Sequence, residues 1–134
     1  MNRQMLVAYG VCAVSFLALD ACWLHLTTDR LYRPAIGALM SGQVDLAAAA
    51  LLYALYFAGV VGFVIVPALE NGSALSALVR GAAFGLVVYA TYDLTNQATL
   101  RDWPWHLTLA DAAWGSVATA IASAVACLVA TRVN

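Results

Sequence analysis

The chain has 134 residues, which is enough for one small domain or one membrane bundle. Hydrophobic residues make up 64% and charged residues 10% of the sequence, against about 45–50% and about 25% in soluble domains. The net charge is −1, all six basic residues are arginine and only three residues are cysteine. This composition excludes a soluble fold, a disordered chain, a nucleic-acid-binding surface and a disulfide scaffold, and it predicts an integral membrane protein.

Four apolar stretches are each long enough to cross a bilayer, which takes about 20 helical residues. In chain order they cover about residues 4–28, 45–69, 74–98 and 107–131. The first is too long for a cleaved signal peptide and carries Asp20 where an apolar core would end, so we expect it to be retained. Short connections make neighbouring helices antiparallel. We predict an all-α four-helix membrane bundle, one domain over residues 1–134, with both termini on one side.

The orientation in the membrane is weakly determined. Three arginines lie on the side of the termini, Arg3, Arg80 and Arg132. Three lie on the opposite side, Arg30, Arg33 and Arg101. The positive-inside rule therefore gives a tie. We expect the termini to be cytoplasmic, with dual insertion as the alternative.

Small residues at intervals of four predict where helices pack closely. The third span contains Gly81-x-x-x-Gly85. The fourth span has such a stripe at Ala112, Ser116, Ala120 and Ala124. Residues of this size let helix backbones approach in lipid, where van der Waals contact drives association.

The acidic residues gather in one leaflet, because spans one and three end on the side where spans two and four begin. Glu70 is the only one of the seven acids on the side of the termini. An ionised carboxylate at the centre of a membrane helix costs about 2.5–3.5 kcal/mol. Asp20, Asp93 and Asp111 must therefore face the bundle interior, a cavity, an arginine or a metal, or be protonated. They are the candidate catalytic residues.

Asp20 and Asp93 are the stronger candidates, because both lie toward helix C-termini, where the macrodipole disfavours a negative charge. Their alternative role is a structural network with Asn96, Tyr92, Tyr32 or Arg101. Asp111 has a simpler explanation, since it lies within about one turn of its predicted helix start.

Other residues on this side also have simple explanations. Asp45 and Asp102 lie at predicted helix N-termini, where an anion is favoured. Trp103 and Trp105 are typical of the aromatic belt at a membrane interface.

One pattern suggests a pocket with an acidic centre and aromatic walls. Asp-x-x-Trp occurs at residues 20–23 and again at 111–114, on antiparallel spans at similar depth, beside Asp93-x-x-Asn96. Tyrosines at helical spacing on spans two and three can meet these residues. The predicted ligand-binding residues are Trp23, Tyr32, Tyr53, Tyr56, Tyr89, Tyr92, Asn96 and Trp114.

No metal site and no cofactor are predicted. His25 and His106 are the only histidines, and the sequence has no His-x-x-x-His or Glu-x-x-His pair to hold zinc or iron. Cys12, Cys22 and Cys127 lie within spans, where cysteine usually acts as a small apolar side chain.

The chain resembles the bacterial membrane family DUF2177 over about residues 16–123. The motifs that carry the resemblance are LDACWL at 19–24, YRPAIGALM at 32–40, YATYDLTN at 89–96, TL at 99–100, WP at 103–104 and DAAWG at 111–115. The resemblance implies a four-helix inner-membrane protein and implies no particular activity.

Three functions fit these patterns. The first is a pocket that binds or modifies a lipid-soluble molecule, with Asp93 transferring a proton and Asp20 or Asp111 as its partner. The second is an accessory subunit or assembly factor of a larger membrane complex. The third is a small proton- or cation-coupled transporter, which needs a homodimer because four helices can hardly enclose a route. Whether the protein is an enzyme is left open; its expected partners are membrane lipids and no nucleic acid.

Overall fold

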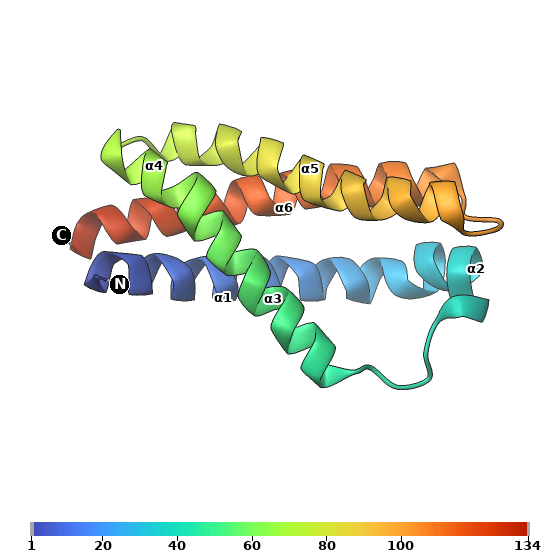
Figure 1. Cartoon of the computed structure of the whole chain (residues 1–134). Helices are drawn as coiled ribbons and strands as arrows, with labels where there is room; N and C mark the ends of the chain where they lie inside the picture. Colours follow the sequence, from blue (N-terminus) through green and yellow to red (C-terminus); the bar gives the residue numbers. More distant parts are fainter. Residues whose placement is uncertain (1, 134) are drawn as a thin grey trace.

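The computed structural model describes residues 2–133 and is helical from end to end, apart from short turns (Figure 1). The elements are α1 (Arg3–Thr27), η1 (Thr28–Tyr32), α2 (Arg33–Ile36), η2 (Gly37–Leu39), α3 (Leu46–Val60), η3 (Val61–Ile65), α4 (Val66–Glu70), α5 (Ala74–Thr99), α6 (Trp105–Ala130) and η4 (Thr131–Val133). Four helical segments are long and apolar enough to cross a membrane. Neighbouring helices are antiparallel and both termini lie at one end, which confirms the predicted fold class (Figure 1).

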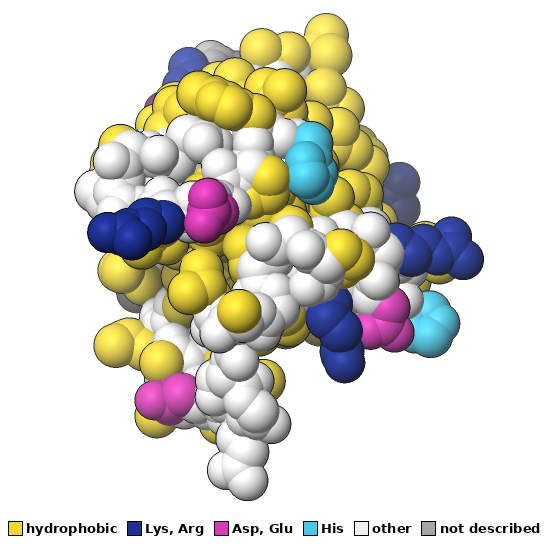
Figure 2. Space-filling model, turned by 90° about the vertical axis from the view of Figure 1, so that its right-hand side faces the viewer, with side chains coloured by type: hydrophobic (Ala, Val, Ile, Leu, Met, Phe, Trp, Pro, Cys, Tyr) yellow, Lys and Arg dark blue, Asp and Glu magenta, His cyan; other side chains and the backbone are white. Residues whose placement is uncertain are grey.

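The surface agrees with a bundle that spans a bilayer. Figure 2 looks onto the end opposite the termini, where arginine, aspartate and histidine side chains project and hydrophobic side chains surround them. Many large apolar side chains along the helices are exposed, such as Leu51 at 71% and Leu109 at 66%. In a bilayer such side chains face lipid.

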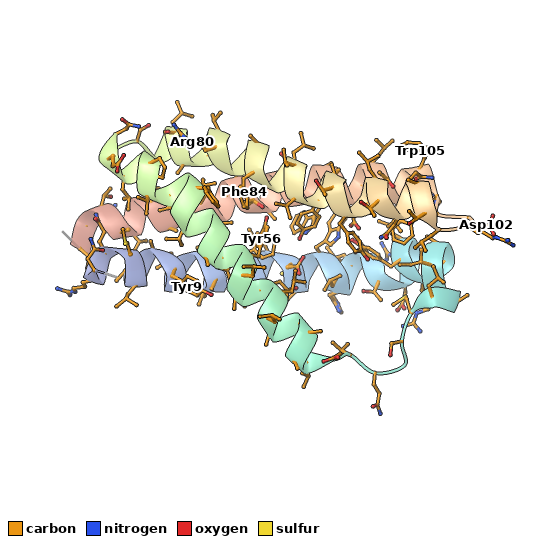
Figure 3. The ribbon with its side chains drawn as sticks, in the orientation of Figure 1. Tyr9, Tyr56, Arg80, Phe84, Asp102 and Trp105 are labelled. Carbon is orange, nitrogen blue, oxygen red and sulfur yellow. The ribbon has the colours of Figure 1, made fainter. Side chains whose placement is uncertain are left out.

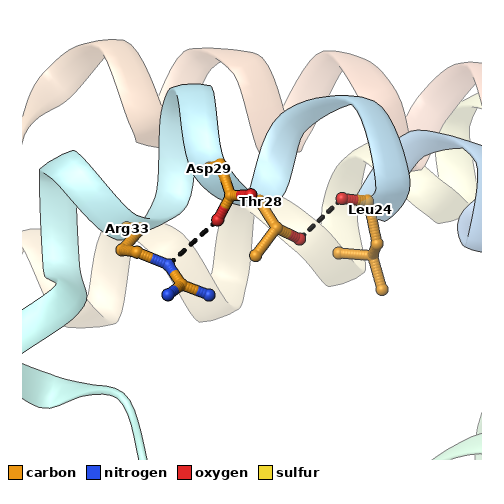
Figure 4. A network of polar contacts seen from close by, with 4 residues as sticks. All are labelled: Leu24, Thr28, Asp29 and Arg33. Atoms are coloured by element: carbon orange, nitrogen blue, oxygen red, sulfur yellow. Dashed lines mark hydrogen bonds and ion pairs between the residues drawn. The ribbon is translucent and has the colours of Figure 1, made fainter.

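The first span extends beyond its predicted end at residue 28, because its helical backbone continues through η1 and α2 to Leu39. The transition is the π-helical turn η1. There the Thr28 hydroxyl donates to the Leu24 carbonyl at 2.6 Å, and Arg33 pairs with Asp29 at 3.0 Å (Figure 4). Side-chain bonds of this kind to the preceding turn often bend a helix.

The tightest packing joins α5 to α6 at glycines. A Cβ added to Gly81 would lie 2.8 Å from both the Thr119 carbonyl and the Ser123 hydroxyl, and one added to Gly85 would overlap the Gly115 carbonyl. The predicted glycine pair is therefore a contact surface.

On α6 the closest approach lies one position before the predicted small-residue stripe. Gly115, Thr119 and Ser123 receive the α5 glycines. Ser116, a member of the predicted stripe, also contacts α5, because its hydroxyl donates to the Ala82 carbonyl at 3.0 Å.

The helix α3 crosses the bundle diagonally (Figure 1). Its C-terminal part packs on the core through Tyr56, Phe57 and Val60, whereas residues 46–55 include no buried side chain. Tyr56 lies at the crossing (Figure 3). The N-terminal half of α3 therefore packs less closely on the other helices than its C-terminal half does.

Side chains cap the starts of two helices, and one of them, Asp45, was predicted at a helix N-terminus. The Asp45 carboxylate accepts from the backbone N–H groups of Ala47 and Ala48 at 3.0 Å each, at the start of α3. The Ser73 hydroxyl accepts from the Ser76 N–H at 3.1 Å, at the start of α5. Both side chains satisfy backbone donors that a helix N-terminus leaves free.

The prediction that Trp103 belongs to an interfacial belt is wrong. Its side chain is only 6% exposed, and its indole N–H donates to the Thr108 hydroxyl at 3.0 Å. Gln97 holds the same corner by donating to the Trp103 carbonyl at 2.7 Å. Trp105, in contrast, is 60% exposed. Trp103 can be buried at the α5–α6 turn because its indole N–H has a hydrogen-bond partner inside the protein.

We expect Gly85→Ala to destabilise the protein, because the new methyl group would meet the Gly115 backbone, which cannot move aside as a flexible side chain can. The expected loss is about 1–3 kcal/mol, typical of overpacking. Thermal unfolding in detergent measures it. Gly10→Ala is the matched control, since nothing lies within 4 Å of its added Cβ. Equal melting temperatures for the two variants would contradict the close α5–α6 contact.

Candidate functional site

A cavity of about 350 Å³ lies among α1, α3, α5 and α6. Its lining residues are Phe16, Asp20, Leu24, Tyr32, Leu52, Tyr53, Tyr56, Val88, Tyr89, Tyr92, Asp111 and Trp114. Three of them are exposed, Leu24 at 42%, Leu52 at 61% and Tyr92 at 62%. Because they come from the long helices α1, α3 and α5 and not from the connecting turns, we infer that the cavity has its mouth between helices, on the side of the bundle.

We attribute the mouth to the loose packing of the N-terminal half of α3, which has no buried side chain between residues 46 and 55. Leu52 and Tyr53 lie on that half and line the cavity on its α3 side. Further along α3, Tyr56 closes the inner end: its hydroxyl shares a hydrogen bond of 2.5 Å with the Thr119 hydroxyl, and its ring lies 5.3 Å from that of Phe16.

Asp20 is held by two neutral donors from two other helices. The Tyr53 hydroxyl on α3 donates to its Oδ2 at 2.8 Å, and the Trp114 indole N–H on α6 donates to its Oδ1 at 3.2 Å. The carboxylate is 8% exposed. These bonds fix its position and partly satisfy its oxygens without cancelling a negative charge.

Asp111 is held by a chain of two donors. The Tyr32 hydroxyl donates to its Oδ1, and the Trp23 indole N–H donates to the Tyr32 hydroxyl at 2.9 Å. The prediction that Asp111 lies within about one turn of its helix start is wrong, because α6 begins at Trp105, almost two turns earlier. The helix terminus therefore does not explain this buried carboxylate.

The two Asp-x-x-Trp patterns exchange partners across the bundle. Trp114 donates to Asp20 directly, and Trp23 reaches Asp111 through Tyr32. Between them the two indoles stack with ring centres 4.6 Å apart and planes 5° apart. The repeated pattern is thus one arrangement that ties α1 to α6. Trp23, a predicted ligand-binding residue, does not line the cavity; it stacks on Trp114, which does.

Asp93 lies apart from this arrangement. Its side chain is fully buried, and neither carboxylate oxygen has a hydrogen-bond partner among residues 2–133. Neither Asp93 nor Asn96 lines the cavity, although Tyr89 and Tyr92 on the same helix do. The predicted network that would join Asp93 to Asn96, Tyr92, Tyr32 or Arg101 does not form in the described chain.

The acidic groups of the site have no basic side chain beside them among the lining residues. Over the described residues the one ion pair joins Arg33 to Asp29, whose side chains are 67% and 80% exposed. None of the lining residues is arginine or histidine, and the sequence has no lysine. In residues 2–133 no three His, Cys, Asp or Glu side chains lie close enough to hold a metal ion. The chemistry of the site therefore depends on carboxyl, hydroxyl and indole groups.

Some lining residues carry no signal in the sequence. Leu24, Leu52 and Val88 border the cavity, but each belongs to an apolar span in which lipid-facing residues have the same composition. The sequence also does not predict a role for Thr119, which lies outside the lining and whose hydroxyl forms a hydrogen bond with that of Tyr56. Only the placement of the helices identifies these four residues.

A family model described as predicted membrane protein, DUF2177, matches residues 5–128. The chain belongs to this family. No curated protein and no solved structure matches it. The match includes every residue that lines the cavity, from Phe16 to Trp114.

The hydrogen-bond pattern predicts different effects for the same substitution at two aspartates. Asp20→Asn should lower stability by about 1–3 kcal/mol, because an amide can accept from only one of Tyr53 and Trp114 through its oxygen. Asp93→Asn should leave stability unchanged or raise it, because it breaks no hydrogen bond and removes a buried carboxylate.

Thermal unfolding of both variants beside the wild type measures this difference. A loss for Asp93→Asn as large as that for Asp20→Asn would mean that Asp93 has a structural partner after all.

Proposed function

We propose that this DUF2177 protein binds a lipid-soluble small molecule that enters the cavity sideways from the bilayer. The observation that carries the proposal is the lateral mouth, bordered by the exposed side chains of Leu24, Leu52 and Tyr92. A molecule dissolved in the hydrocarbon could reach the site without crossing a polar surface.

The size and lining of the cavity support a small-molecule ligand. The cavity volume of about 350 Å³ lies within the range of about 300–1,000 Å³ that is typical of small-molecule sites. Sites of this kind are mostly apolar and contain a few placed polar groups that orient the ligand. Here those groups are the Asp20 and Asp111 carboxylates and the hydroxyls of the lining tyrosines.

The same residues give the site the means to modify its ligand by acid–base chemistry. Asp20 and Asp111 both line the cavity, so either can reach a bound molecule, and a carboxyl group in an apolar site can donate or accept a proton near neutral pH. This moves the proposed proton-transferring role from Asp93 to Asp20 and Asp111. Asp93 makes no contact with the cavity through which it could act directly.

Filling the cavity tests the proposal. Val88 lines it, and Val88→Trp would place an indole in the space that the ligand needs. The matched control is Val87→Trp on the same helix, where the side chain is 63% exposed and lies outside the cavity. Native mass spectrometry of gently solubilised protein should find a bound small molecule in the wild type and in Val87→Trp, and none in Val88→Trp.

Thermal unfolding first establishes that both variants fold. A molecule bound equally to both variants would contradict a ligand site in this cavity. No bound molecule in any sample, with a second polypeptide co-purifying, would favour an accessory subunit instead.

A further inference from the structure

We propose that the cavity selects a hydrophobic cation, that is, a hydrocarbon molecule that carries an ammonium group. This inference rests on the proposed function and names the class of ligand. It comes from the acidic groups of the site, the aromatic rings that surround it, and the order in which polar and apolar residues line it.

The first argument is that two buried carboxyl groups line the cavity and no basic side chain does. Asp20 and Asp111 are each 8% exposed, and their hydrogen-bond partners are the neutral groups of Tyr53, Trp114 and Tyr32. No basic side chain lines the cavity. Neutral donors offset only part of the desolvation cost of an ionised carboxylate, and a positive charge beside it offsets more of that cost. A ligand that brings its own cation supplies what the protein lacks.

The second argument is the aromatic lining. Seven of the twelve lining residues have aromatic rings: Phe16, Tyr32, Tyr53, Tyr56, Tyr89, Tyr92 and Trp114. Several of these rings lie against each other at steep angles, as for Tyr56 and Tyr89, whose centres are 6.3 Å apart at 72°. Aromatic faces attract cations, and rings that surround a cavity from several sides are the usual site for a quaternary ammonium group.

The third argument is polarity along the cavity. The carboxylates of Asp20 and Asp111 are buried, whereas Leu24 and Leu52 are exposed at the mouth. A ligand would therefore enter with its ammonium group inward and leave its hydrocarbon part at the bilayer side. A phospholipid headgroup fits less well, because its phosphate would lie among carboxylates with no arginine or lysine to bind it.

Isothermal titration calorimetry with the full chain in dodecyl maltoside, whose headgroup is uncharged, tests the inference. The probes are decyltrimethylammonium, its neutral analogue with carbon in place of nitrogen, decyl sulfate and a short-chain phosphatidylcholine. We expect the ammonium probe to bind the wild type. We expect the neutral analogue and decyl sulfate to bind it at least about tenfold more weakly. Binding of the ammonium probe but not the phosphatidylcholine identifies a free amphiphilic amine as the ligand; equal binding of both points to a lipid headgroup.

Two charge-removing variants complete the test. Asp20→Asn and Asp111→Asn should each weaken binding of the ammonium probe about tenfold or more. Asp102→Asn is the matched control, because Asp102 lies in the α5–α6 turn at the far end of the bundle and its left-handed backbone, with φ of 56°, also suits asparagine (Figure 3). Its binding should equal that of the wild type.

The outcomes separate the two proposals. If the neutral analogue binds as well as the ammonium probe and Val88→Trp displaces both, the cavity holds lipid-soluble molecules and the inference of a cation is wrong. If no probe binds the wild type more tightly than it binds Val88→Trp, both proposals fail.

Discussion

The close approach of α5 and α6 is the contact on which the rest of the site depends. At Gly85 and Gly115 the two backbones meet with no side chain between them, and the Tyr89 ring lies over Gly115, where any side chain on α6 would overlap it. This contact sets the rotation of α6 about its axis and so turns Asp111 and Trp114 toward α1. Without the hydrophobic effect to separate helix faces in lipid, such steric fit decides which faces meet.

The second constraint is the placement of carboxylates inside a membrane protein. Asp20 and Asp111 are surrounded by hydroxyl and indole donors on three other segments, so their position joins α1, α3, η1 and α6. Asp93 has no such donors and is fully buried. The three aspartates thus differ in hydrogen bonding: within residues 2–133, neighbouring segments present donors to Asp20 and Asp111 but none to Asp93.

The cavity results from helices that do not pack along their whole length. The helix α3 is anchored at its C-terminal end by Tyr56, Phe57 and Val60, and its N-terminal half diverges from α1 and α5. The π-helical segment η1 joins α1 to α2, and the π-helical segment η3 joins α3 to α4. Changes of this kind in helical winding often occur near functional sites. The lateral mouth is thus a consequence of how the second span is tilted.

Much of this protein follows from its sequence. Composition alone determined that it is a membrane protein. The lengths of its four apolar stretches determined the number of spans, because about 20 helical residues match a bilayer, and the short connections made neighbouring spans antiparallel. The doubled Asp-x-x-Trp pattern and the spaced tyrosines also indicated most of the polar lining, since buried charge in lipid must face the interior. The tertiary structure alone decided the isolation of Asp93, the burial of Trp103, the register of the α6 contact and the apolar wall of the cavity. The physical reason is that these helices are apolar on nearly every side, so no contrast in polarity fixes how each one is rotated; only the fit of side chains against neighbouring helices does.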